Sequence, residues 1–305
     1  MYCARVLLTA VILTAWCDVS AKPEKDGRIA ASTALSAKGV KAPVYAVRDW
    51  HRFVSRIYYT PPNKAYEVLC KSAAGSDVPK ARIGCIDGNP RFRVFAVARH
   101  DATDTVGSFV LEGVIQAFLA KDALGHWLRE NVELMVVPFA DYDTAMKCKK
   151  GARCKSRGYV GNYEKQDTPE VKAIVEWIKS HAGGKLDAFF DFCGNSDLPQ
   201  AVVAGGEDEK KFSAILKTVQ HDGCGYSDAN DAAFDQEKSG TASFAWAAKN
   251  VKGVKIARSF SMPVAQEDGG TGYTAGKCRL FGAGIAHALK VYLNGENLFN
   301  PEVVC

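Results

Sequence analysis

The chain has 305 residues, of which 47% are hydrophobic and 24% charged, and its formal net charge is +5. This length suits one large α/β domain or two small ones, and the lack of a Pro/Ser-rich linker, an internal repeat or a low-complexity tract favours one. The positive charge is mild, and the one dense basic stretch, residues 147–157, lacks interleaved aromatic side chains, so we expect no nucleic-acid partner.

Residues 1–21 have the pattern of a secretory signal peptide. Arg5 supplies the positive start, residues 6–15 form an apolar stretch too short to span a bilayer, and residues 19–21 resemble a cleavage site. No later stretch reaches the roughly 18 consecutive apolar residues of a membrane span. We therefore expect a secreted or extracytoplasmic protein with no membrane contact after signal cleavage, and one domain over residues 22–305.

The first half of the domain reads as strands followed by a helix and another strand. Early strands are predicted at residues 66–70, 81–86 and 92–98, separated by turns rich in Gly, Ser and Asp. A helix at residues 105–120 carries apolar side chains on one face, at Phe109, Val110, Val114, Ala117 and Phe118. An apolar run at residues 132–138 ends in Pro, as a buried strand would.

The second half begins with a long connection, residues 140–166, of the kind that is functional or pinned by a disulfide. Pro169 then opens a helix at residues 170–181, whose inward residues are Val171, Ile174, Val175 and Ile178. The remaining elements are a strand, two helices, a strand and a closing helix, at residues 186–192, 208–220, 242–250, 254–262 and 275–293. This alternation predicts an α/β fold with a mostly parallel sheet covered on both faces.

Eight cysteines remain after residue 21, and an even number in an exported chain suggests disulfides. The shortest loops would join Cys70 to Cys85 and Cys148 to Cys154. A bond between Cys278 and Cys305 could hold the carboxyl-terminal tail.

The strand-to-helix junction at residues 99–113 is the most informative motif. His100 and Asp104 follow a predicted strand directly, so both side chains can point into one cleft and hold a divalent metal. A second interpretation is that Asp104 or Thr103 caps the following helix by accepting its free backbone N–H groups.

This junction resembles that of the zinc carboxypeptidase family, in which a strand, His-x-x-Glu, a small-residue turn and a helix follow one another. Three further stretches resemble family motifs in the same order, at residues 136–143, 186–193 and 258–263. The resemblance covers roughly residues 60–295. It implies a zinc carboxypeptidase-like fold, with a mixed and mostly parallel sheet of about eight strands between helices.

The resemblance also implies a zinc site, with His100 as the first ligand. The second ligand would be Asp104, since Thr103 stands where the family has Glu. Cys193 stands where the family has a third ligand, His, and Asp191 would orient a ligand from behind. His, Asp and Cys thiolate are all competent zinc ligands. Cys193 has another possible fate, which is a disulfide with Cys224, and we favour the disulfide.

Two further positions that have a catalytic or binding role in the family carry different residues here. Ser261 stands in the position of the catalytic Glu, and a neutral hydroxyl cannot act as the general base, whose loss costs about 10²–10⁴-fold in rate. No Arg remains near residues 161–162, where the family grips the substrate carboxylate. Arg153 and Arg157 could replace that grip, or could be solvated charges in the long connection.

Two functions follow from these positions. The first is metallocarboxypeptidase-type hydrolysis of C-terminal peptide bonds with zinc, weak or lost because of Cys193 and Ser261. The second is a pseudoenzyme that keeps the fold and uses the old cleft to bind a peptide, a protein C-terminus or another partner.

Overall fold

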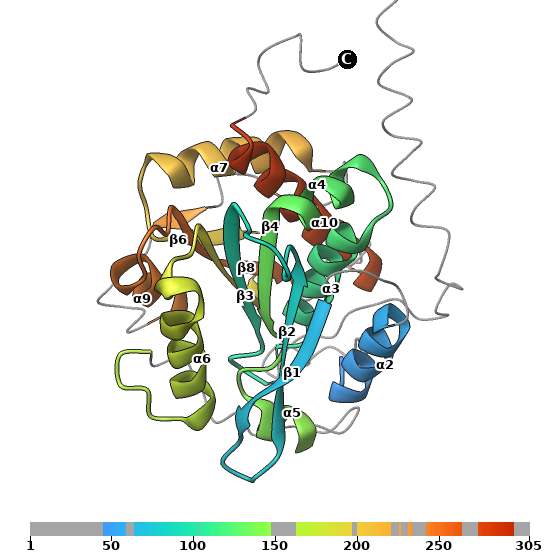
Figure 1. The fold of residues 1–305 in the computed structure, drawn as a ribbon, viewed down its shortest axis with the longest axis vertical. Coiled ribbons are helices and arrows are strands. Elements are labelled where there is room, and N and C mark those ends of the chain that lie inside the picture. The colour runs from blue at the N-terminus through green and yellow to red at the C-terminus, as the bar shows by residue number, and fades with distance from the viewer. Residues whose placement is uncertain are drawn as a thin grey trace, which may run out of the picture.

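An eight-stranded mixed sheet, in the order β1-β2-β4-β3-β5-β8-β6-β7, forms the centre of this computed structural model (Figure 1). The structure describes residues 45–58, 64–102, 104–147, 163–196, 200–220, 226, 231–233, 242–263 and 274–295. The strands are β1 (Lys64–Lys71), β2 (Asp77–Gly84), β3 (Phe92–Ala98), β4 (Val132–Val137), β5 (Ala188–Ser196), β6 (Gln200–Val203), β7 (Ala232–Ala233) and β8 (Ile256–Pro263).

The four central strands, β4, β3, β5 and β8, run parallel to one another, while β2 and β6 join them antiparallel. All six residues of β4 are buried, as are the last five of β3. Such continuous apolar runs are typical of parallel strands that are covered on both faces. The predicted α/β fold with a mixed, mostly parallel sheet is confirmed.

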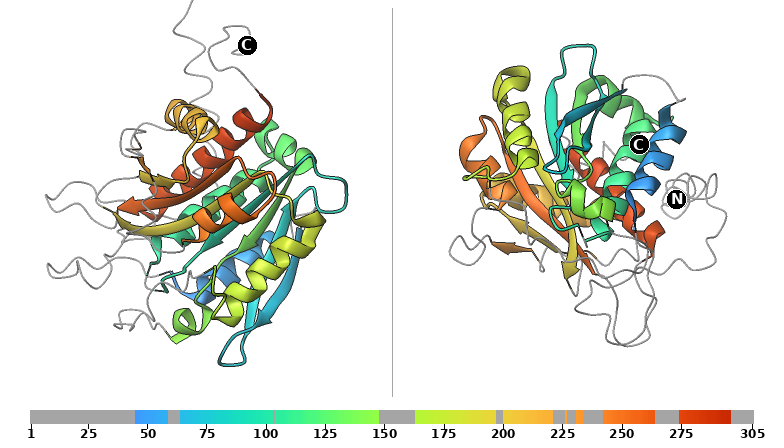
Figure 2. Two further views of the ribbon diagram at one scale, coloured as in Figure 1. Left: turned by 90° about the vertical axis from the view of Figure 1, so that its left-hand side faces the viewer. Right: turned by 90° about the horizontal axis from the view of Figure 1, so that it is seen from below.

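Helices cover the two faces of the sheet unequally (Figure 2). One face packs against α6 (Pro169–Ser180) and α9 (Ser243–Asn250). The other face packs against a larger set, which comprises α2 (Val47–Tyr58), α3 (Val106–Leu119), α4 (Ala123–Asn131), α7 (Glu207–Val219) and α10 (Ala275–Leu293). Among the described helices, none is both long and apolar enough to cross a bilayer.

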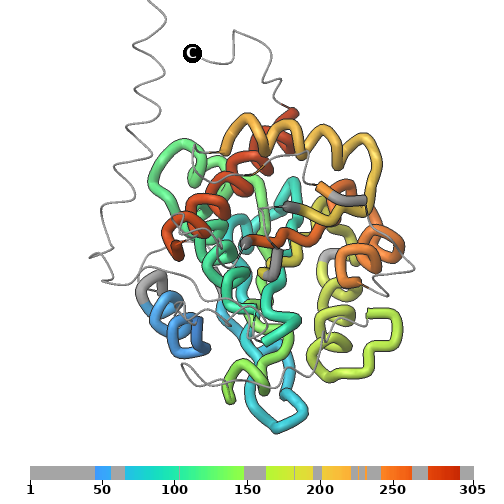
Figure 3. Tube along the Cα trace, turned by 180° about the vertical axis from the view of Figure 1, so that it is seen from behind, coloured from blue at the N-terminus to red at the C-terminus, as the bar shows by residue number. Residues whose placement is uncertain are grey.

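Helix α3 lies between the sheet and α10, and twelve of its fourteen residues are buried. Two glycines let the helices touch. A Cβ added to Gly113 would lie 2.0 Å from the Arg279 carbonyl oxygen, and one added to Gly282 would lie 2.0 Å from that of Val110. Helix α7 crosses beside α10 (Figure 3), where the Tyr292 hydroxyl donates to Asp208.

Some local predictions differ from the structure. The connection at residues 140–166 is not irregular throughout, because α5 (Tyr142–Lys147) begins just after β4. In α5, Asp143 accepts hydrogen bonds from the Ser72 hydroxyl at 2.5 Å and the Ala74 N–H at 2.9 Å. These contacts fix α5 against the turn between β1 and β2, and no local sequence pattern announces them.

The expected disulfide between Cys70 and Cys85 is wrong, since both are free thiols. Cys70 pairs with Val78 near the turn of the β1–β2 hairpin, whereas Cys85 follows the far end of β2. The two cysteines therefore lie at opposite ends of one hairpin. Cys148, Cys154 and Cys305 lie outside the described residues, so the other two expected pairs are not described.

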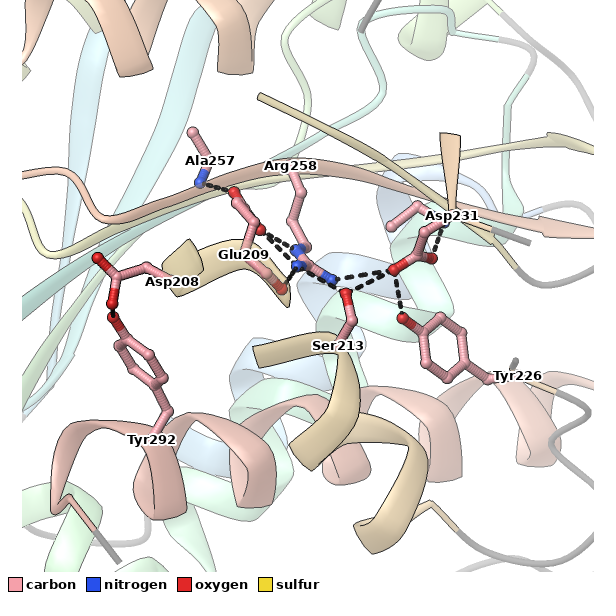
Figure 4. Close-up of polar contacts among 9 residues, drawn as sticks. Asp208, Glu209, Ser213, Tyr226, Asp231, Ala257, Arg258 and Tyr292 are labelled. Carbon is pink, nitrogen blue, oxygen red and sulfur yellow. Dashed lines mark hydrogen bonds and ion pairs between the residues drawn. The ribbon is translucent and has the colours of Figure 1, made fainter. Parts of the chain in front are cut away.

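A buried ionic cluster joins β8 to α7 (Figure 4). Arg258 is fully buried, and its Nε donates to Glu209 at 2.9 Å while its Nη1 lies 3.7 Å from Asp231. The ring of Phe212 lies 4.8 Å from the guanidinium. Asp231 also accepts hydrogen bonds from the hydroxyls of Ser213, at 2.6 Å, and Tyr226, at 2.7 Å. Burial raises the pKa of Glu209, which Arg258 offsets in part.

Candidate functional site

The carboxyl-terminal edge of the parallel strands carries most of the predicted site residues. His100 follows β3, Asp191 and Cys193 lie in β5, and Ser261 lies in β8 directly opposite Cys193. Open α/β sheets place their sites at this edge. The predicted substrate-binding residues Arg153 and Arg157 lie outside the described part of the chain, as does Thr103.

A chain of hydrogen bonds runs through His100. Its Nδ1 lies 3.0 Å from Asp191 Oδ1, and its Nε2 lies 2.9 Å from the Tyr163 hydroxyl. The Ser243 hydroxyl donates to the other Asp191 oxygen at 2.6 Å. All four side chains are buried, with exposed fractions of 2% or less.

The chemistry of these groups sets the direction of each bond. Burial, together with the charge of Asp191, raises the pKa of Tyr163 well above its usual value, so its hydroxyl keeps its proton and can donate it to an unprotonated Nε2 of His100. An ionised Asp191 only accepts, so Nδ1 of His100 carries the ring proton. We therefore assign His100 as the neutral Nδ1–H tautomer, whose Nε2 lone pair accepts the Tyr163 proton.

Asp104 does not cap α3, contrary to one interpretation of the sequence, because the N-cap residue is Thr105. Its Oδ2 accepts instead from the Gly194 N–H of β5. A Cβ on Gly194 would lie 2.4 Å from Oδ1 of Asp104, so glycine permits this approach. Among the described residues, none forms a hydrogen bond to the buried Oδ1 atom, and burial raises the pKa of Asp104 to about 7.

Cys193 is a free thiol bonded to the neighbouring strand, and the expected disulfide with Cys224 is not formed. Its Sγ donates to the Phe260 carbonyl at 3.2 Å and lies 3.1 Å from the Ser259 hydroxyl. Burial, with smaller contributions from Asp104 and Asp191, raises the pKa of the thiol far above its usual range. Cys224 itself lies outside the described residues.

These donors do not fit a zinc ion. A metal ligand needs a free lone pair, yet both ring nitrogens of His100 are already hydrogen-bonded. Cys193 would have to lose a strongly held proton, because the thiolate is the ligand form. Within the described ranges, no three His, Cys, Asp or Glu side chains are grouped so as to hold a metal.

Sequence reasoning missed Tyr163 and Ser243. Tyr163 precedes α6 at the end of the long connection, and Ser243 is the first residue of α9. Neither belongs to a motif with a fixed spacing from His100. Only the folded chain brings them to His100 and Asp191.

Comparisons with known proteins identify the fold. No protein-family model matches the chain, and no curated protein matches it by sequence. Solved structures, by contrast, are similar to it. The Burkholderia cenocepacia metallo-carboxypeptidase has a TM-score of 0.68 and 18% identity, over 83% of this chain and 70% of that one.

The second is a Pseudomonas aeruginosa metallo-carboxypeptidase in complex with (2-guanidinoethylmercapto)succinic acid, at TM-score 0.63 and 17% identity, over 82% and 70%. The third is bovine thrombin-activatable fibrinolysis inhibitor in complex with tick carboxypeptidase inhibitor. Its TM-score is 0.55 at 13% identity, over 81% of this chain and 98% of that one. The chain therefore has the metallo-carboxypeptidase fold.

Tyr163→Phe is expected to lower the free energy of unfolding by about 1–3 kcal/mol, because it removes the hydroxyl that is hydrogen-bonded to Nε2 of the buried His100. Urea denaturation followed by tryptophan fluorescence measures this change. Tyr66→Phe is the matched control, since Tyr66 is 40% exposed, and it should change stability much less. Equal effects of the two substitutions would contradict the assigned bond.

Cys193 is expected to resist alkylation by iodoacetamide in the native protein at mildly alkaline pH, because only the thiolate reacts and burial keeps the thiol protonated. It should react fully once the protein is unfolded without a reductant. Mass spectrometry of peptides from both states measures the labelling. A Cys193 that stays unlabelled until reduction would be a disulfide, contrary to the structure.

Proposed function

We propose that this protein is a non-catalytic member of the metallo-carboxypeptidase fold, which binds a peptide or a partner protein at the carboxyl-terminal edge of its sheet. The observation that carries this proposal is the commitment of both His100 ring nitrogens to hydrogen bonds with Asp191 and Tyr163. A histidine in this state contributes no lone pair to a metal. We therefore expect no metal-bound water to be available for hydrolysis at this site.

The residue at the position of the general base supports the same proposal. Ser261 lies on β8 opposite Cys193 and is 8% exposed. A hydroxyl does not take a proton from water near neutral pH, and loss of a general base costs about 10²–10⁴-fold in rate. The proposal that the protein binds a peptide or a partner rests on the fold. The thrombin-activatable fibrinolysis inhibitor, which is similar in structure, was solved in complex with a protein inhibitor.

The test combines metal analysis with peptide binding. Residues 22–305 are equilibrated with zinc, dialysed and analysed for metal. Matched peptides with a free or an amidated C-terminus are then titrated by fluorescence anisotropy and assayed for cleavage. We expect substoichiometric zinc and peptide binding without hydrolysis. Ser261→Arg should weaken this binding, whereas Glu176→Arg, at an exposed position of α6, should leave it unchanged.

Stoichiometric zinc with release of C-terminal residues would overturn the proposal in favour of a zinc carboxypeptidase. Binding of the free C-terminus only would identify a protein C-terminus as the ligand. Equal binding of both peptides would identify an internal segment. Absence of any peptide binding, or binding that both variants leave unchanged, would overturn the assignment of this edge as the binding site.

Ser261→Glu alone is expected to produce no measurable peptidase activity. The new carboxylate would supply a base, but His100 would still be bonded to Tyr163 and no metal-bound water would be available. Hydrolysis of C-terminal peptide substrates, measured with added zinc, checks this result. Substantial turnover would show that the metal site is functional.

We also propose that the protein is exported and that residues 1–21 are removed. The support is the charged start, the apolar stretch and the small-residue site near residue 21. Amino-terminal sequencing of the product recovered outside the cytoplasm should begin at Lys22. A product that retains residues 1–21 would exclude cleavage.

A further inference from the structure

Lysines from three segments gather at the amino-terminal edge of β5 and β8, which is opposite the edge that carries His100. They come from the last turn of α6, the start of the β5 segment, and the end of α9 with the connection to β8. Helices α6 and α9 cover the same face of the sheet and lie side by side there (Figures 1 and 3). We call this set the lysine cluster, and its members are exposed: Lys179, Lys185, Lys249, Lys252 and Lys255.

Backbone contacts hold these segments together. Lys185 and Lys252 form a parallel β-bridge, and the Leu186 N–H donates to the Lys252 carbonyl at 3.1 Å. The Lys255 N–H donates to the Asp187 carbonyl at 3.0 Å. Lys179 joins the cluster from α6, with its Nζ 6.0 Å from the ring centre of Trp246 in α9.

Most carboxylates at this edge are bonded to groups other than these lysines. In the first turn of α7, Glu207 pairs with Lys210, Asp208 accepts from Tyr292 and Glu209 pairs with Arg258. Lys249 lies 3.8 Å from Glu164, and both side chains are exposed. Asp187 is buried, and its carboxylate accepts the Arg93 N–H at 2.9 Å. Within the part of the chain that the structure describes, no carboxylate forms an ion pair with Lys185, Lys252 or Lys255.

Helix dipoles explain only part of the cluster. Lys179 and Lys249 lie in the last turns of α6 and α9, where a cation is favourable. Lys185, Lys252 and Lys255 lie outside these helices. Neighbouring like charges on paired backbones are destabilising, so gathering them has a cost that a bound anion would offset.

We propose that the lysine cluster binds an acidic polysaccharide through its repeated sulfate or carboxylate groups. Lysine places a point charge on a flexible stem, which suits anions at variable spacing. Stacking of nucleic-acid bases needs exposed aromatic rings, whereas the nearby Trp177 and Trp246 are buried. Insertion into a membrane needs exposed apolar side chains, and the large ones among the described residues are Tyr66, Val68 and Met146, on β1 and α5.

The test uses the whole exported chain and two probes, heparin for sulfate and alginate for carboxylate. Binding is measured by calorimetry or surface plasmon resonance at salt concentrations between about 50 and 200 mM, over which such contacts weaken steeply. The triple variant Lys185→Gln, Lys252→Gln, Lys255→Gln should bind at least about tenfold more weakly. The triple variant Lys71→Gln, Lys121→Gln, Lys172→Gln loses the same charge elsewhere and should bind like the wild type.

Equal losses in the two triple variants would overturn the proposal, because net charge alone would then explain binding. Failure of the wild type to bind either polysaccharide would also overturn it. Tighter binding to an oligonucleotide or to anionic phospholipid vesicles would assign the cluster to a different ligand class. Circular dichroism melting of both variants establishes that each is folded. The result is independent of peptide binding at the opposite edge.

Discussion

Replacing Arg258 with Met is expected to lower the free energy of unfolding by about 3–5 kcal/mol, the usual cost of removing one partner from a buried ion pair. Arg258 is 0% exposed and lies between Glu209 and Asp231. Without its guanidinium, the carboxylates of Glu209 and Asp231 stay in a largely buried site with no compensating cation among the described residues. Urea denaturation measures the loss.

Two further variants serve as comparisons for Arg258→Met. Lys172→Met removes an exposed ion pair with Glu176 and should change stability by no more than about 0.5 kcal/mol. Combining Arg258→Met with Glu209→Leu should recover part of the loss, since the unpaired carboxylate is then removed as well. If Arg258→Met costs no more than Lys172→Met, the cluster does not stabilise the fold.

Gly282→Ala is expected to destabilise the protein by about 2–4 kcal/mol, through overpacking at the contact of α10 with α3. The added methyl group would lie 2.0 Å from the Val110 carbonyl oxygen and 2.9 Å from the Val114 nitrogen. Both atoms belong to the backbone of α3, so a side-chain rotation cannot relieve the clash. The helices would have to separate, which would weaken packing along α10. Thermal and urea denaturation both measure this effect.

Gly276→Ala in the same helix is the matched control. Among the atoms that the structure describes, its added methyl group would meet only the Thr274 hydroxyl, at 3.5 Å. Alanine is favoured over glycine within a helix by up to about 1 kcal/mol, so this variant should be neutral or slightly more stable. If Gly282→Ala lowers the stability and Gly276→Ala does not, the effect arises at the crossing of α10 with α3. A stable Gly282→Ala protein would exclude the close contact.

Long periodic elements could be predicted from the sequence, because local pattern and tertiary burial agree in them. The strand at residues 92–98 and the helix at residues 275–293 match β3 and α10 in full. The short α5 and the two-residue β7 could not be predicted, since contacts distant in sequence stabilise them. The motif positions indicated that His100 follows one strand and that Asp191 lies in another, which is the neighbouring β5. They gave no sign of Tyr163, whose role depends only on where the folded chain carries it.

The bond between Tyr163 and His100 bears on how such a protein could change function over time. If one ligand and the general base were the only differences, Cys193→His and Ser261→Glu could supply them one at a time. Here the Tyr163 hydroxyl lies 2.9 Å from the ring nitrogen of His100 that a metal would need. Each restoring substitution would bring no benefit while that hydroxyl remains. The loss of activity that we propose is therefore hard to reverse in small steps, and a design that rebuilds a peptidase on this scaffold would begin by removing Tyr163.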